Sequence, residues 1–155
     1  MKITEKLKQL SLNITLLYVE DDEVIRNKTY KILSRIFDNI EVAQNGEEAV
    51  LMYMKTKHDL IISDIIMNTM NGIDMAKAIK NVNNNQNIIF VSAYTEQKFL
   101  TDAIELGVDA FVFKPIDTEK LYQSIEKSVR QIILIKENNE YKNNLETLVK
   151  KRSAA

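Results

Sequence analysis

Three carboxylates, one hydroxyl and one ammonium stand at the ends of apolar runs that are far apart in the sequence: Glu20, Asp21, Asp64, Ser92 and Lys114. Each run has the composition of a buried strand. Because parallel strands end together at one edge of a sheet, we expect the five side chains to gather in one crevice. Together these groups would suit a divalent cation and a phosphoryl group.

The three carboxylates predict a site for Mg2+. Anions held close together repel one another unless a cation is present. Magnesium prefers hard oxygen ligands, usually one or two carboxylates with a phosphate oxygen and water. Lys114 would add a flexible positive charge, and Ser92 would donate a hydrogen bond to a phosphoryl oxygen. An aspartate nucleophile that attacks phosphorus is established covalent chemistry and would be available here.

Each of these features is weaker when taken alone. An acidic residue after a strand is usually a helix N-cap or part of a turn, which we expect for Asp22 or Glu23. Asp64 by itself is also compatible with a cap, and Lys114-Pro115 by itself would indicate a turn. The chemical prediction therefore depends on the whole set, in this order and at these intervals.

Five buried strands separated by helices would position this set. The apolar runs are Ile14–Val19, Ile40–Ala43, Leu60–Ser63, Ile88–Ser92 and Ala110–Phe113. Most are continuous in apolar residues, which is typical of strands covered on both faces. Helical periodicity is found in Glu23–Phe37, Glu47–Lys55, Ile73–Val82, Glu96–Leu106 and from Thr118 onward. This alternation predicts an α/β fold, a three-layer αβα sandwich around a five-stranded parallel sheet.

Composition excludes several classes of function. The chain has 155 residues, of which 45% are apolar and 28% charged, as in one globular domain. Its net charge of -1 gives no indication of nucleic acid or an anionic membrane as a partner. It has no cysteine, which excludes disulfides and thiolate chemistry. With neither a membrane-spanning run nor a secretion signal in the sequence, we expect a cytoplasmic protein without direct nucleic-acid or membrane contact.

Two segments lie outside the predicted sandwich, which we assign to residues 14–132. Residues 1–13 form a short amphipathic lead-in of unclear role. Residues 133–155 extend the last helix beyond the length that one sheet layer can cover. There a stripe with alternating spacings of four and three is typical of a coiled coil: Leu134, Asn138, Tyr141, Leu145 and Leu148. A homodimer through this helix and a frayed, solvated helix both remain open.

Residues 14–132 resemble the receiver domain of two-component response regulators. The motifs that carry the resemblance are Leu17–Asp22, Ser63–Met67, Gly72, Val91–Ala93 and Phe111–Pro115. The family implies a flavodoxin-like sheet of order 2-1-3-4-5, with the site at the topological switch point. It also implies a cis peptide bond between Lys114 and Pro115.

The resemblance assigns a role to each site residue. Asp64 would be the phosphoacceptor and Asp21 the direct Mg2+ ligand. Further ligation would come from Asp64, from Glu20 through water and from the backbone carbonyl of Ile66. Ser92 and Phe111 would be the switch residues and Lys114 the partner of the phosphoryl group. A histidine kinase or a phosphotransfer protein would be the donor, and the face formed by Glu96–Leu106, Ala110–Phe113 and the helix from Thr118 would respond.

Three positions deserve separate expectations. The family often has proline where this chain has Asn68, which should loosen the loop without affecting the chemistry. Ile66 and Tyr94 occupy the positions that control hydrolysis of the acyl phosphate, and their bulk predicts slow autodephosphorylation. His58 lies in a polar turn without a second metal-ligating partner, and we expect it on the surface.

Two other functions are compatible with the same fold. A small-molecule phosphatase that forms an aspartyl phosphate usually has a second aspartate two residues after the nucleophile, where this chain has Ile66. A flavin- or nucleotide-binding protein would need a glycine-rich first loop, whereas this loop is the acidic segment Glu20–Glu23. We therefore expect a regulatory phosphoacceptor rather than an enzyme. The output target is not indicated, and the chain could be part of a larger protein.

Overall fold

The computed structural model describes residues 2–93 and 97–154. Its helices are α1 (Ile3–Leu10), α2 (Glu23–Leu33), α3 (Gly46–Thr56), α4 (Gly72–Val82), α5 (Gln97–Leu106) and α6 (Thr118–Ala154). Its strands are β1 (Thr15–Val19), β2 (Asn39–Ala43), β3 (Leu60–Asp64), β4 (Asn87–Ala93) and β5 (Ala110–Lys114). All neighbouring strands pair in parallel, in the order β2-β1-β3-β4-β5. The predicted fold class and strand order are confirmed.

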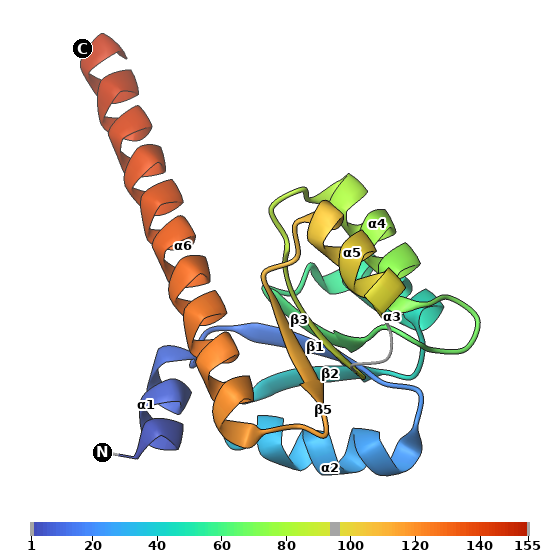
Figure 1. The fold of residues 1–155 in the computed structure, drawn as a ribbon. Helices are drawn as coiled ribbons and strands as arrows, with labels where there is room; N and C mark the ends of the chain where they lie inside the picture. The colour runs from blue at the N-terminus through green and yellow to red at the C-terminus, as the bar shows by residue number, and fades with distance from the viewer. Residues whose placement is uncertain (1, 94–96, 155) are drawn as a thin grey trace.

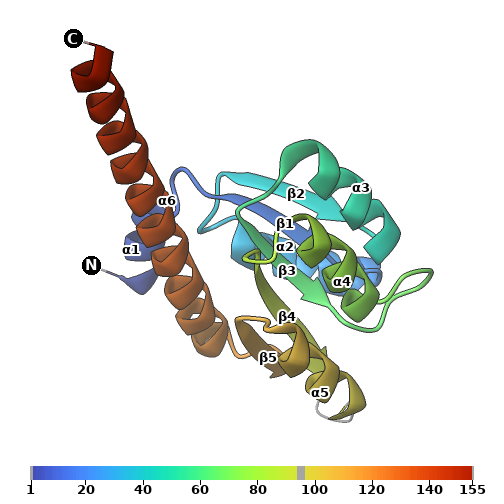
Figure 2. The ribbon, with the colours of Figure 1, turned by 90° about the horizontal axis from the view of Figure 1, so that it is seen from above.

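Alternate residues of each strand enter two separate cores, one on each face of the sheet. The first contains side chains such as Leu16, Tyr18 and Ile62, packed with α1, α2 and α6. The second contains Leu17, Val19 and others, packed with α3, α4 and α5. Figure 2 shows these two helical layers from above. Because both faces are covered, the central strands are apolar along nearly their whole length.

Asparagine and aspartate side chains begin three of the helices. Asp22, Asn45 and Asn71 each accept a hydrogen bond from a backbone N–H three residues ahead. These caps satisfy donors that have no partner within the first helical turn. The predicted cap at the start of α2 is thus Asp22. Such local signals explain why most helix starts can be read from the sequence.

The end of α2 differs from the prediction. We expected this helix to reach Phe37, but it ends at Leu33. The Ser34 hydroxyl donates to the Lys31 carbonyl oxygen at 2.9 Å, and the chain then continues in tight turns. Ile36 and Phe37 remain buried in the first core despite lying outside the helix. The apolar periodicity therefore predicted correctly which residues are buried, but the helix is shorter than it indicated.

The two terminal segments lie side by side. Helix α6 has 37 residues, and its distal half rises clear of the sandwich, while α1 lies beside its proximal half (Figure 1). Leu7 of α1 is fully buried in the first core, and Nζ of Lys6 lies 4.0 Å from Oε1 of Glu126 on α6. Residues 3–10 thus complete the core instead of only leading into it. Within the described ranges no helix is both long and apolar enough to cross a bilayer.

Leu7→Ala should lower the free energy of unfolding by about 2–5 kcal/mol, because it leaves a cavity in a closed core. Leu12→Ala is the matched control, since Leu12 is 53% exposed and should change stability by about 0.5 kcal/mol or less. Urea denaturation of both variants measures the difference. Equal midpoints for the Leu7 variant and the parent protein would contradict a structural role for α1.

Candidate functional site

The carboxyl edge of the sheet brings the three predicted carboxylates together. Glu20 and Asp21 follow β1, and Asp64 is the last residue of the neighbouring strand β3. One carboxylate oxygen from each lies within 4.8 Å of the others. Glu20 and Asp64 are buried, and Asp21 is half-buried. The arrangement follows from parallel pairing of β1 with β3, which ends both strands at the same edge.

Lys114 reaches the same cluster from the end of β5. Its Nζ donates a hydrogen bond to Asp64 Oδ2 at 2.9 Å and lies 3.7 Å from Glu20 Oε2. The ammonium is largely shielded, so this ion pair is less screened by water than a surface pair. The peptide bond between Lys114 and Pro115 is cis. The positive charge of Lys114 therefore lies against two of the three carboxylates, Asp64 and Glu20.

Short backbone contacts fix the Asp64 carboxylate and the loop that follows it. The backbone N–H of Ile65 donates to Asp64 Oδ1 at 2.7 Å. The N–H of Gly72 donates to the Ile65 carbonyl at 2.6 Å. A Cβ at position 72 would lie only 2.5 Å from the Asp64 carbonyl oxygen, closer than real Cβ atoms approach. Glycine at this position is what allows the start of α4 to pack against the site.

Two further residues support the site: Arg26, which the sequence reasoning missed, and Asn68, which was expected only to loosen its loop. The Arg26 guanidinium donates to the carbonyl oxygens of Glu20 and Asp21, at 3.0 and 3.3 Å. The backbone N–H of Asn68 donates to Asp21 Oδ2 at 3.3 Å. A proline at position 68 could not make that bond, since it lacks the N–H. The departure from the family pattern thus adds a tie between the loop and Asp21, and no spacing rule would have revealed it.

The predicted switch residues lie on β4 and on the neighbouring edge strand β5. Ser92 is buried on β4, one residue beyond Val91, which is paired with Asp64 in the sheet. Phe111 on β5 is half-buried, with its ring centroid 5.9 Å from that of Phe90 and 6.3 Å from that of Phe113. Phe111 packs against the second core, to which Ala103 of α5 also belongs. The switching roles of Ser92 and Phe111 stay predictions.

Burial and charge repulsion act strongly on Glu20. Burial, followed by the neighbouring Asp64 carboxylate, raises the pKa of Glu20 from 4.5 to about 8, although Lys114 opposes this shift. The carboxyl group of Glu20 is therefore costly to ionise unless a further cation lies beside it. The ligand atoms that this cluster offers to a metal are carboxylate oxygens, which hard divalent cations such as Mg2+ prefer. The cluster therefore fits a metal ion of this class.

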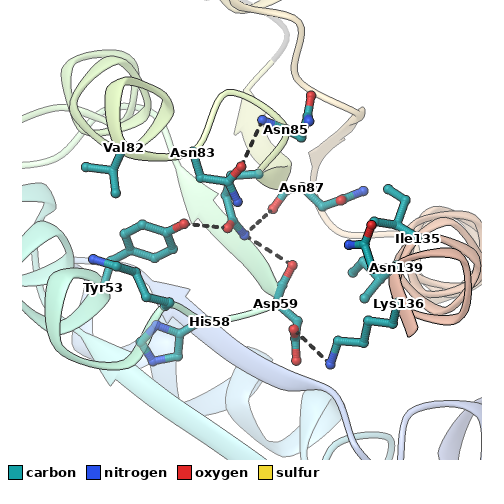
Figure 3. Close-up of a pocket in the computed structure, with 13 residues that line it drawn as sticks. Tyr53, His58, Asp59, Val82, Asn83, Asn85, Asn87, Ile135, Lys136 and Asn139 are labelled. Atoms are coloured by element: carbon teal, nitrogen blue, oxygen red, sulfur yellow. Dashed lines mark hydrogen bonds and ion pairs between the residues drawn. The ribbon is translucent and has the colours of Figure 1, made fainter. Parts of the chain in front are cut away.

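A different pocket, of about 400 Å3, lies at the opposite edge of the sheet. Figure 3 shows that its polar side chains contact one another. Tyr53 donates to Gln86 at 2.7 Å, Gln86 donates to the Asp59 carbonyl, and Lys136 pairs with the Asp59 carboxylate at 3.0 Å. This network joins α3 and the two loops that precede β3 and β4 to α6, which indicates a structural role.

The prediction that His58 is a surface residue is wrong. Its side chain is 1% exposed and stacks on Tyr53, with ring centroids 6.4 Å apart. The cause is Lys57, whose left-handed backbone (φ 55°) turns the chain under α3 immediately before His58. Nε2 of His58 lies 2.8 Å from Glu41, and this hydrogen bond holds the pKa of Glu41 below its ordinary value.

Comparison with known proteins agrees with this geometry. Residues 16–126, more than half of the chain, match the family model of the response regulator receiver domain. The chain belongs to this family. It is 33% identical to the chemotaxis protein CheY of Bacillus subtilis over 115 residues, which are 74% of this chain and 96% of that protein. Receiver domains are the regulatory phosphoacceptor modules of two-component response regulators.

Solved receiver-like structures superpose on most of the chain. The N-terminal domain of an uncharacterized protein of Wolinella succinogenes is 36% identical, with a TM-score of 0.73, and covers 79% of this chain and 98% of its own. CheY from the CheX-CheY-BeF3-Mg complex of Borrelia burgdorferi is 28% identical, with a TM-score of 0.69. That match covers 75% of this chain and 89% of the other.

The two positions predicted to control hydrolysis differ in what the structure describes. Ile66 follows the site on the loop after β3 and is 47% exposed. Tyr94 lies outside the described residues. In this receiver, an apolar side chain therefore lies two residues beyond Asp64.

The metal-free receiver should lose stability as pH rises from about 5 toward about 8. Because the pKa of Glu20 is higher in the folded protein than its ordinary value of 4.5, the folded state holds a proton that unfolding releases across this window. The Glu20→Gln variant lacks this component. Urea denaturation at several pH values, with a chelator present, should show a steeper decline for the parent protein. If the stability of the two proteins fell equally with pH, the raised pKa of the buried Glu20 carboxyl group would be contradicted.

Proposed function

We propose that Asp64 accepts a phosphoryl group from a phosphohistidine of a sensor histidine kinase or a phosphotransfer protein. The observation that carries this proposal is the contact of Lys114 Nζ with Asp64 Oδ2 inside the three-carboxylate cluster. This contact places the ammonium of Lys114 beside the buried Asp64 nucleophile. The carboxylate oxygens of the same cluster could bind a cation. The same triad of acid cluster, strand-end aspartate and lysine matches the family motif.

In the proposed reaction, an Asp64 oxygen attacks phosphorus in line while the phosphorus–nitrogen bond of the donor breaks. The released imidazole keeps the electron pair of that bond and takes a proton. Glu20, Asp21, Asp64 and the backbone carbonyl of Ile66 would hold Mg2+, with Glu20 acting mainly through water. A bound Mg2+ would offset the charge on the reacting oxygens. Lys114 stabilises the transferred group from the end of β5.

The switch would follow from the new charge on Asp64. A phosphoryl group brings nearly two negative charges and strong acceptor oxygens. Ser92 turns toward it, and Phe111 turns inward into the space that Ser92 leaves. This reshapes the face formed by α5, β5 and α6. A shift from 1:99 to 99:1 needs about 5.5 kcal/mol, and charge-assisted hydrogen bonds from Ser92 and Lys114 supply roughly 1.5–3 kcal/mol each.

We assign the protein to the cytoplasm, with no direct contact to nucleic acid or membrane, and treat residues 14–132 as the receiver unit. In this reading the receiver is regulatory, and its only reactions are its own phosphorylation and the loss of that phosphate. A second copy of the chain is the further partner, bound through the helical extension 133–155.

Acetyl phosphate with Mg2+ should add one phosphate to the protein, measured by intact-protein mass spectrometry. Asp64→Asn should abolish the mass gain because the nucleophile is lost, and Asp21→Asn should raise the Mg2+ concentration that the mass gain requires. The control Asp74→Asn changes an exposed carboxylate of α4 and should be phosphorylated normally. Labelling of the Asp64 variant, or steady turnover of p-nitrophenyl phosphate as a phosphatase would show, would overturn the proposal.

The phosphorylated protein should lose phosphate slowly, and Ile66→Asn should accelerate the loss severalfold. A polar side chain beside the acyl phosphate would admit and orient water, whereas isoleucine excludes it. Val82→Asn is the matched control, since Val82 is equally exposed at 47% but lies at the opposite edge of the sheet. Decay of the phosphorylated mass with time measures the rate. An unchanged decay rate in the Ile66 variant would show that this side chain does not control hydrolysis.

A further inference from the structure

The distal half of α6 carries an apolar stripe that leaves its side chains in solvent. Leu134, Tyr141, Leu145 and Leu148 are 65%, 64%, 44% and 53% exposed. With Asn138 they are spaced by four, three, four and three residues, the alternation of the a and d positions of a coiled coil. An apolar stripe with this spacing is typical of a helix that packs against another helix.

The stripe lies on the side of α6 away from the core, although its first residue, Leu134, borders a pocket together with receiver residues such as Asn84 and Asp109. Ile125, on the proximal half of α6, is fully buried against the sheet. Leu134 follows nine residues later, which is about two and a half helical turns and therefore the opposite side of the helix. Figure 1 shows the distal half standing clear of the other elements. A partner helix could lie along the part of the stripe beyond Leu134 without meeting the sandwich.

The distal helix has little intrinsic stability of its own. It contains four asparagines, at positions 138, 139, 143 and 144, and asparagine is a weak helix former. Isolated helices of such composition are marginal in water, and packing of an apolar face normally stabilises them. Burial of the stripe is therefore what would keep this segment helical.

Resting on the second-copy partner of the proposed function, we propose that the stripe is the seam of a parallel, in-register, two-stranded coiled coil formed with that copy. In that arrangement Asn138 occupies an a position and pairs with Asn138 of the second copy, so both amides are satisfied. Glu137 and Lys142 occupy g and e positions and form ion pairs between the helices in both directions. The leucines and Tyr141 pack across the seam in matching layers.

An antiparallel pairing is chemically worse. With the a and d layers aligned, Asn138 would face Leu148 and its buried amide would lack a partner. Lys142 would lie near Lys142 of the other chain, where like charges repel. The parallel form avoids both contacts. It also places the two receivers on the outer sides of the coil and the C-terminal ends of both helices side by side.

Sedimentation equilibrium of the full chain should show a concentration-dependent monomer–dimer equilibrium. The Leu145→Asp/Leu148→Asp variant should raise the dissociation constant by about tenfold or more, because it places charges in the seam. Asn143→Asp, which changes the opposite face of the helix, is the matched control and should dimerise like the parent. Phosphorylation of Asp64 should survive in all three proteins, which separates failure of the dimer from failure of the phosphoacceptor role.

Single cysteines test the orientation, since the chain has none of its own. Leu134→Cys and Leu148→Cys should each form a disulfide with the same residue of the second copy under mild oxidation, and Asn143→Cys should not. An antiparallel coil would instead join Asn138→Cys to Leu148→Cys in a mixture of the two variants. A monomer at all concentrations, a trimer or that mixed crosslink would each overturn the proposal.

Discussion

The structure depends on an imbalance of charge at the carboxyl edge of the sheet. Parallel pairing brings Glu20, Asp21 and Asp64 within 4.8 Å of one another, while Lys114 supplies one compensating charge at 2.9 Å from Asp64. Burial makes the excess negative charge costly, as the raised pKa of Glu20 indicates. A site in this condition gains free energy from a divalent cation. It also responds to any group that changes the charge on Asp64.

The two edges of the sheet use polar groups in opposite ways. At the amino edge, Tyr53, Gln86, Asp59 and Lys136 form a connected network that joins the loops to α6. At the carboxyl edge, the same sheet holds like charges close together, with Lys114 in contact with Asp64 and Glu20. The first arrangement stabilises the fold, and the second stores electrostatic repulsion that binding can relieve. This contrast marks the carboxyl edge as the candidate functional end of the molecule without reference to any relative.

Helix α6 connects the two proposals physically. Its proximal half packs against the sheet beside β5, the strand that ends at Lys114, and its distal half presents the opposite face to solvent. A continuous helix transmits a change in its proximal packing to the position of its distal end. In a parallel coil, two receivers would act on one pair of helix ends. α1 adds to this unit by filling the core beside α6 with Leu7.

The sequence by itself determined the order of elements, the parallel sheet and the strand ends that carry Asp64 and Lys114. These depend on apolar periodicity and on parallel strands ending at one edge, which are regular along the chain. Tertiary structure alone decided that His58 is buried, that the Asn68 N–H bonds Asp21 and that Leu7 belongs to the core. Those outcomes depend on which distant segment covers each residue. No local pattern encodes that choice, because burial and hydrogen-bond partners are properties of the packed chain.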